Sequence, residues 1–193
     1  MDRARALAQR SPKRIGGYRR RDSRDGSAAI EFAIIAPILV FFVIGLLETG
    51  AIYYFNSMMA NAAGDAARML RTGQVQTQGL TQAQYVAQIC SEMTAMVSLS
   101  DCNSNLQVDM EAFNSYTNAD YADVVNSDGS LNTGAMQFNP GNSCDTVLVR
   151  AFYPWSIMTP LMKPVLQNMP NGQYLMTSAA AFRNEPFTAG ASC

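Results

Sequence analysis

The stretch GSAAIEFAIIAPILVFFVIGLLE, residues 26–48, decides how this chain is organised. Apart from Glu31 near its start, it contains no charged residue before Glu48. A helix needs about 20 mostly apolar residues to cross a bilayer, so the segment is long enough to span one. Pro37 lies inside it, and membrane helices tolerate proline better than soluble helices do. We expect a membrane helix that kinks near Pro37 without breaking.

The charges on the two sides of this segment have opposite sign. Residues 1–26 carry nine Lys/Arg against three Asp, a net charge of +6, whereas residues 27–193 carry five basic and twelve acidic residues, a net charge of −7. Short basic segments beside a span stay in the cytoplasm, so we expect the body of the chain on the other side of the membrane. A basic tail can also bind nucleic acid. Because the apolar run follows at once, we expect no nucleic-acid partner.

The start of the apolar helix carries a pattern of its own. An ordinary secretory signal has an apolar core of about 7–15 residues and an A-x-A-like cleavage site, and neither feature fits here. Gly26 followed by Ser27-Ala28-Ala29-Ile30-Glu31 resembles the processing site of type IV prepilins. The resemblance implies that a prepilin peptidase cuts between Gly26 and Ser27, and that Glu31 is the acid retained at the fifth mature position.

Glu31 has a physical rationale in that setting. A carboxylate near a helix N-terminus is favoured by the exposed N–H groups. Cleavage creates a new amine at Ser27, and in a bundle of subunits Glu31 can pair with a neighbour's amine, which offsets the burial of both charges. The simpler alternative is that Glu31 lies at the level of the lipid headgroups.

A narrower resemblance rests on both ends of the chain. Glu31-Phe32-Ala33-Ile34-Ile35-Ala36-Pro37 and Ala181-Phe182-Arg183-Asn184-Glu185-Pro186-Phe187 resemble the TadE-like family, minor pseudopilins of tight-adherence (Tad) pilus systems. The resemblance implies a minor pseudopilin needed for assembly of a Tad/Flp-type adhesive pilus in the bacterial inner membrane. The implied partners are prepilin peptidase, other pilins and pseudopilins, the inner-membrane assembly platform and the lipid bilayer. The alternative is an uncleaved, signal-anchored protein with an external binding or adhesion domain.

We therefore expect a basic cytoplasmic leader (1–26, removed), a transmembrane and extended helix (27–72), and an external α+β domain (73–193). Gly73 suits the C-cap of the long helix. Small residues near its end can pack on neighbouring subunits or on the protein's own sheet: Ala60, Ala63, Gly64 and Ala67.

The external domain is expected to be α+β, with a second amphipathic helix and a small antiparallel sheet. A polar linker, 74–79, precedes a capping box formed by Thr81 and Gln84. Apolar residues at helical spacing then continue to Val97. Three strands are expected, over 106–112, 146–153 and 174–183, and the alternation of the first predicts that its polar face meets water.

Four cysteines lie in this domain: Cys90, Cys102, Cys144 and Cys193. An even number in an exported domain favours disulfides, with free thiols or a metal as weaker alternatives. Cys90 and Cys102 close a short loop, which would leave Cys144 for Cys193, but the sequence allows three pairings. The chain has no histidine and these cysteines form no CxxC pair, so we expect no metal site.

Two further segments leave alternatives open. Residues 116–142 are rich in Asn, Asp, Ser and Gly and predict a solvated loop; a calcium site at Asp120, Asp123 and Asp128 is the alternative, although the spacing does not match an EF-hand. The segment from Pro154 to Pro170 is apolar and irregular. It is interpreted as a lid over the core, with a subunit contact as the alternative.

The sequence contains no catalytic constellation. Without histidine, Ser–His and Cys–His pairs are impossible. There is no GxSxG, no SxxK and no glycine-rich phosphate loop. We expect no enzyme activity and no cofactor.

Overall fold

A computed structural model describes residues 24–114 and 123–193, so nearly all of the basic leader and Asp120 lie outside the described residues. The chain divides into two units, residues 1–41 and residues 42–193. The described residues of the first unit all belong to helix α1, Arg24–Arg71, which continues into the second unit. The expected long apolar helix is confirmed, and it passes Pro37 without a break.

Helix α1 ends where glycine permits a left-handed backbone. Gly73 has φ +78°, and its N–H donates to the carbonyl oxygen of Leu70 at 3.0 Å. The expected polar linker that follows is wrong, because residues Gln74–Gln78 form a short helix, α2. Its one apolar residue, Val75, is buried in the core, and this burial decides the conformation of an otherwise polar segment.

The second amphipathic helix is α3, Gln82–Glu92. Its capping box is confirmed, with the Thr81 side chain accepting from the Gln84 backbone N–H and the Gln84 side chain accepting from the Thr81 backbone. The helix ends five residues before Val97, and an unpredicted helix, α4 (Leu99–Asn105), follows it. The N-cap Ser98 accepts from the Asp101 N–H at 3.2 Å, a capping signal that was visible in the sequence.

Three strands form one antiparallel sheet in the order β1-β2-β3, as expected. They are β1 (Gln107–Phe113), β2 (Thr146–Ser156) and β3 (Gln173–Arg183). Strand β2 runs three residues further than predicted and includes Pro154, which lies opposite Leu175 of β3. Strand β1 pairs with β2 only as far as Phe152, so β2 is an edge strand at Pro154, where a sheet tolerates proline.

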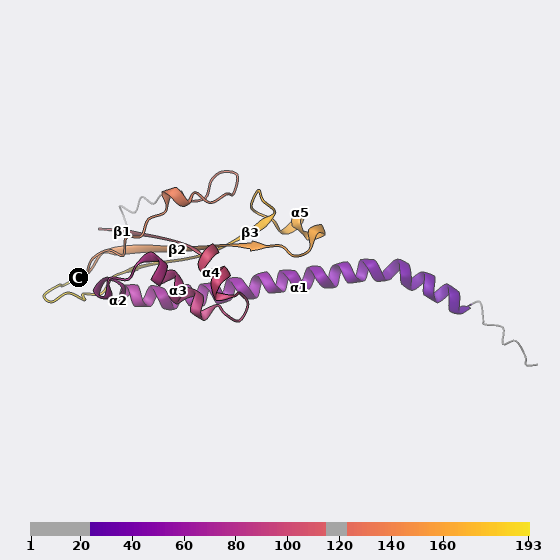
Figure 1. Cartoon of the computed structure of the whole chain (residues 1–193), viewed down its shortest axis with the longest axis horizontal. Helices are drawn as coiled ribbons and strands as arrows, with labels where there is room; N and C mark the ends of the chain where they lie inside the picture. The colour runs from indigo at the N-terminus through magenta and orange to yellow at the C-terminus, as the bar shows by residue number, and fades with distance from the viewer. Residues whose placement is uncertain (1–23, 115–122) are drawn as a thin grey trace, which may run out of the picture. The chain divides into compact units, whose positions relative to one another are not determined.

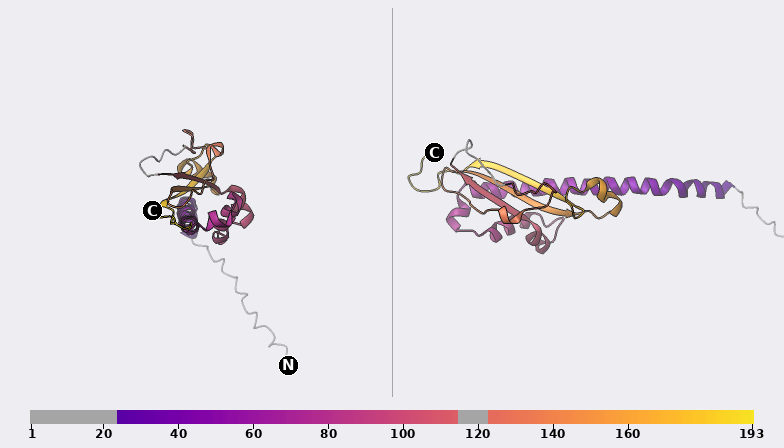
Figure 2. Two further views of the ribbon diagram at one scale, coloured as in Figure 1. Left: turned by 90° about the vertical axis from the view of Figure 1, so that its left-hand side faces the viewer. Right: turned by 90° about the horizontal axis from the view of Figure 1, so that it is seen from above.

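The two faces of the sheet are covered by different parts of residues 42–193, as Figure 1 and the end-on view of Figure 2 show. Alternate residues of each strand face α1 to α4; the register places Met110, Val149 and Ala180 side by side on this face. The main core lies here and includes Phe55 and Met59 of α1.

The opposite face of the sheet corrects two predictions. The polar face of β1 does not meet water: Asp109 and Glu111 are buried, at 0% and 6% exposure. The segment expected to be a solvated loop covers them in its described part. Within it, the Met110 N–H donates to the carbonyl oxygen of Gln137 at 2.9 Å, and Val124 packs with Phe152 in a second small core.

Arg150 of β2 explains why this burial is tolerated. It lies opposite Asp109 in the register, and its guanidinium contacts both acids. The Nη2 atom is 2.6 Å from Asp109 Oδ2 and 3.0 Å from Glu111 Oε1. The backbone N–H of Gln137 also donates to Asp109 Oδ1 at 2.8 Å. Buried carboxylates need such partners, so the acids and their cover segment depend on each other.

Candidate functional site

The start of α1 carries the predicted processing residues. Gly26, Ser27 and Glu31 lie in the first turns of the helix, and the side chains of Ser27 and Glu31 are exposed. The Ser27 hydroxyl donates to Glu31 Oε1 at 3.1 Å, one helical turn away. The backbone nitrogen of Ser27 and the Glu31 carboxylate therefore belong to adjacent turns of one helix face.

Gly26 has no packing reason for being glycine within the described fold. A Cβ atom built at this position would meet no atom within 4 Å, and the residue does not have a positive φ. Glycine inside a helix is about 1 kcal/mol less favourable than alanine. The described fold therefore gives no reason for glycine at position 26, and the same holds for Gly50 and Gly64 of this helix.

The apolar segment of α1 is long enough to cross a membrane. Among the described residues, the helix stretch Gly26–Arg71 is the one that meets the length and hydropathy requirements, and little of its most apolar part is buried. From Ile30 to Leu47 its large apolar side chains are exposed, with Phe41 half-buried. An exposed apolar helix of this length indicates single-pass anchoring in a membrane.

A contact at the end of this segment was not predicted. Glu48, the first charged residue after the apolar run, is buried. Its Oε1 atom accepts the backbone N–H groups of Met158, at 2.5 Å, and Thr159, at 3.2 Å. No local motif could have revealed this contact, because the partners are more than a hundred residues away in sequence.

Residues 157–172, here named the β2–β3 loop, contain the turns η3 (Pro160–Met162) and α5 (Lys163–Leu166). The interpretation of this crossing as a lid holds for Ile157 and Met169, which are buried, and for Leu166, which packs against the main core. Three other apolar side chains of the loop, Met158, Leu161 and Val165, are exposed by 70%, 72% and 75%.

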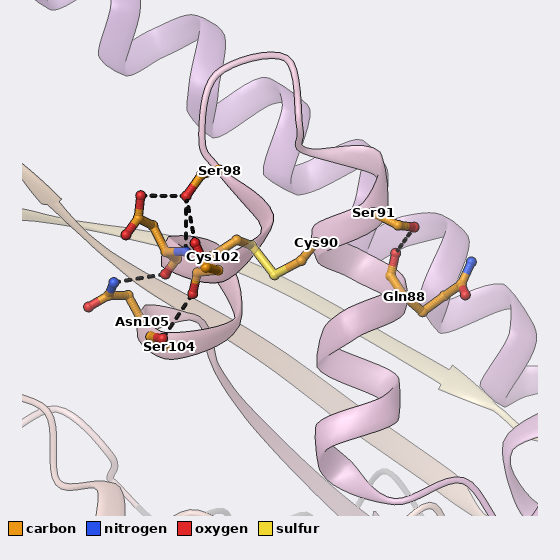
Figure 3. The surroundings of a disulfide bond; sticks show 9 residues. Gln88, Cys90, Ser91, Ser98, Cys102, Ser104 and Asn105 are labelled. Carbon is orange, nitrogen blue, oxygen red and sulfur yellow. Dashed lines mark hydrogen bonds between the residues drawn. A yellow bond between two sulfur atoms is a disulfide. The ribbon is translucent and has the colours of Figure 1, made fainter.

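The four cysteines form two disulfides, and the structure leaves none of them free. Cys90 of α3 is bonded to Cys102 of α4, with a Cα–Cα distance of 5.7 Å, and the bond holds the two short helices together (Figure 3). Cys144, just before β2, is bonded to Cys193, with a Cα–Cα distance of 5.4 Å. The second bond fastens the last residue of the chain to the start of the central strand.

The small residues near the end of α1 divide between the two alternatives. Ala63 and Ala67 are buried against the protein's own core, whereas Ala60 and Gly64 are exposed. Two of these small residues therefore pack in the protein's own core, and the other two face away from it.

The described part of the chain offers little acid–base chemistry. No group of three or more His, Cys, Asp or Glu side chains is placed there to hold a metal ion. Burial raises the pKa of Tyr85, and burial together with the charge of Asp101 raises the pKa of Tyr153. Both phenols pack in the main core, where they serve as apolar side chains.

A long apolar helix that leads into a disulfide-bonded α+β head defines a membrane-anchored protein of the single-helix class. The model of the family described as TadE-like protein matches residues 26–68. This match covers α1 from Gly26 almost to its end, and it confirms the TadE-like resemblance predicted for the N-terminal stretch; residues 181–187 lie outside the match. It supports a protein associated with Tad pili. Neither a curated protein nor a solved structure matches the chain.

Proposed function

We propose that the chain is a minor pseudopilin of a Tad/Flp-type adhesive pilus, and that prepilin peptidase processes it after Gly26. The observation that carries the proposal is the position of Gly26. It lies five residues before Glu31, at the first residue of the helix segment that matches the TadE-like family. Its surroundings are open, as those of Gly50 and Gly64 are, so the backbone is accessible. A peptidase that must bring the backbone into its active site supplies the reason for glycine that the fold does not.

Glu31 takes the second role in this proposal. Cleavage leaves the amine of Ser27 at the helix start, one turn from the Glu31 carboxylate. In lipid, either charge alone is costly. When the helices of several subunits pack together, Glu31 of one copy pairs with the amine of a neighbour, and this pairing favours the correct axial stagger of the subunits.

The partners follow from this assignment. Prepilin peptidase removes the leader, 1–26, on the cytoplasmic side of the inner membrane. The helix, 27–72, remains in the bilayer until it packs with other pilins and pseudopilins at the inner-membrane assembly platform. The head, 73–193, lies on the periplasmic side, where its cysteines are oxidised. Nucleic acid has no part in this proposal.

An uncleaved, signal-anchored protein with an external binding or adhesion domain is the second candidate. The charge asymmetry, the exposed helix and the two disulfides favour it as much as they favour a pseudopilin. It gives no reason for the spacing from Gly26 to Glu31. Processing after Gly26 therefore separates the two functions.

The test is the N-terminal mass of the membrane-bound protein, expressed with and without a prepilin peptidase. We expect a peptidase-dependent start at Ser27 that Gly26→Ala abolishes. Gly50→Ala is the matched control, because Gly50 lies in the same helix and is equally open. An intact leader under both conditions would instead assign the chain to the signal-anchored class.

A second measurement, the number of pili on the cell surface, separates the two proposed roles at the helix start. Glu31→Ala should still be cleaved, but it should fail to assemble when pili are counted on the cell surface. Asp65→Ala, which removes an exposed acid from the same helix, should leave assembly intact. Full piliation by Glu31→Ala would reject the pairing role without touching the processing claim.

A further inference from the structure

We propose that the β2–β3 loop docks on the surface of the lipid bilayer beside α1, so that the head is held to the membrane at two places. The proposal does not depend on cleavage at Gly26 or on a place in a pilus. It requires only that α1 spans the membrane. The exposed surface of the loop contacts lipids of the bilayer that α1 spans.

The level of the membrane boundary follows from α1. Residues 27–47 rise about 31 Å at 1.5 Å per residue, close to the roughly 30 Å thickness of a hydrocarbon core. The outer boundary of that core therefore falls near Leu47. Tyr53 and Tyr54, which follow within two turns, are both exposed, and tyrosine is enriched at this level of membrane proteins.

The β2–β3 loop is fastened to α1 at this boundary. The Met162 side chain lies on Gly45, where a Cβ atom would be only 3.0 Å from its Cε atom. One turn along the helix, Glu48 accepts the backbone N–H groups of Met158 and Thr159. The two contacts fix the height of the loop on α1 as the height at which the apolar run ends.

The exposed surface of the loop has the composition of a membrane-facing segment. Met158, Leu161 and Val165 are its most exposed apolar side chains. The loop contacts α1 at Gly45 and Glu48, and the residues between these two, Leu46 and Leu47, are also exposed. A patch this apolar on a protein surface marks a binding site. The loop adjoins the part of α1 that lipid already covers. Lipid is therefore present beside the loop without any other protein, and we take it as the binding partner.

The charge of the loop agrees with this partner. Residues 27–193 as a whole have a net charge of −7. Within them, residues 157–172 contain no Asp or Glu, and their one charged residue is Lys163. Lys163 is exposed. A lysine at the edge of an apolar surface can reach the phosphates of anionic lipids while its stem lies on the acyl boundary.

The test uses the full chain reconstituted into vesicles of phosphatidylethanolamine and phosphatidylglycerol, with or without bromine on the acyl chains. Brominated acyl chains quench tryptophan fluorescence only at short range. Leu161→Trp is made in a Trp155→Phe background, since Trp155 is the only native tryptophan. Leu47→Trp is the positive control. Ala189→Trp is the negative control, because it lies beyond the end of β3 that is remote from the loop.

We expect bromolipid to quench Leu161→Trp nearly as strongly as Leu47→Trp, at every protein-to-lipid ratio, and to leave Ala189→Trp unchanged. Met158→Trp supplies a second loop position with the same expectation. Quenching of the loop positions no greater than that of Ala189→Trp, with Leu47→Trp still quenched, would overturn the proposal. Protection of the loop from aqueous acrylamide that disappears on dilution in lipid would also overturn it, because a second copy would then be the occupant.

Discussion

Replacing Arg150 by methionine tests whether the outer face of the sheet is buried as described. The change keeps most of the side-chain length but removes the cation from between Asp109 and Glu111, both of which are buried. Two opposite charges about 3 Å apart attract by about 5 kcal/mol at an effective dielectric constant near 20. The variant loses two such contacts and leaves two buried carboxylates without the cation between them. Part of this loss is offset, because the free-energy cost of desolvating the guanidinium is no longer incurred.

Net losses for breaking a buried ion pair on one side are about 3–5 kcal/mol. We therefore expect Arg150→Met to lower the free energy of unfolding of the head by that amount. For a protein of this size the loss corresponds to a fall of about 10 °C in Tm. The assay is thermal unfolding of the full chain in detergent with its disulfides intact, followed by the fluorescence of Trp155, which packs on Phe55 at a ring-centroid distance of 5.0 Å.

Two further variants make the result interpretable. Arg68→Met removes an exposed arginine from α1 and should change the free energy by less than about 0.5 kcal/mol. Combining Arg150→Met with Asp109→Asn and Glu111→Gln removes all three charges and should recover most of the stability. A loss below about 1 kcal/mol for Arg150→Met is the size found for solvent-exposed pairs. It would refute the claim that the described part of residues 116–142 covers this face.

Two other predictions concern the ends of the head. Removing the longer disulfide with Cys144→Ser and Cys193→Ser should cost about 4 kcal/mol, since it opens a ring closed over 49 residues; denaturant unfolding measures the loss, and a protein of unchanged stability would contradict it. Gly73→Ala should cost well over 1 kcal/mol, because its φ is +78° and the new Cβ would lie 2.2 Å from the Phe187 ring; an unchanged Tm would mean that α1 does not end as described.

The parts of the fold that could be predicted from the sequence depend on neighbouring residues. The apolar run, the Thr81–Gln84 capping box and the alternation of β1 are periodic or local signals, and each led to the correct element. The short helix α2 was missed because a single buried valine outweighs five residues of linker-like composition. Helix α4 was missed although Ser98 and Asp101 carry a capping signal.

The remaining errors concern contacts between distant residues. Alternation along β1 cannot show whether its polar face meets water, because the answer depends on Arg150 and on a cover segment beyond β1. The candidate site divides in the same way. The spacing from Gly26 to Glu31 lies within six residues and was visible at once, whereas the role of Glu48 became apparent only when its carboxylate was found on the backbone of Met158.

The bond between Cys144 and Cys193 also determines how the head responds to a pulling force. Strands β2 and β3 lie inside one covalent ring, so β3 cannot peel away from the C-terminal end as a free strand would. A chain under tension extends by about 3.5 Å for each residue that unfolds. Cys144 and Cys193 are 49 residues apart in sequence, so the disulfide prevents an extension of roughly 170 Å. The elements before Cys144 lie outside the ring, so tension acts first on their contacts, which include the packing of Phe55 and Met59 of α1 and the pairing of β1 with β2. The disulfide thus confines mechanical opening of the head to the part that precedes Cys144.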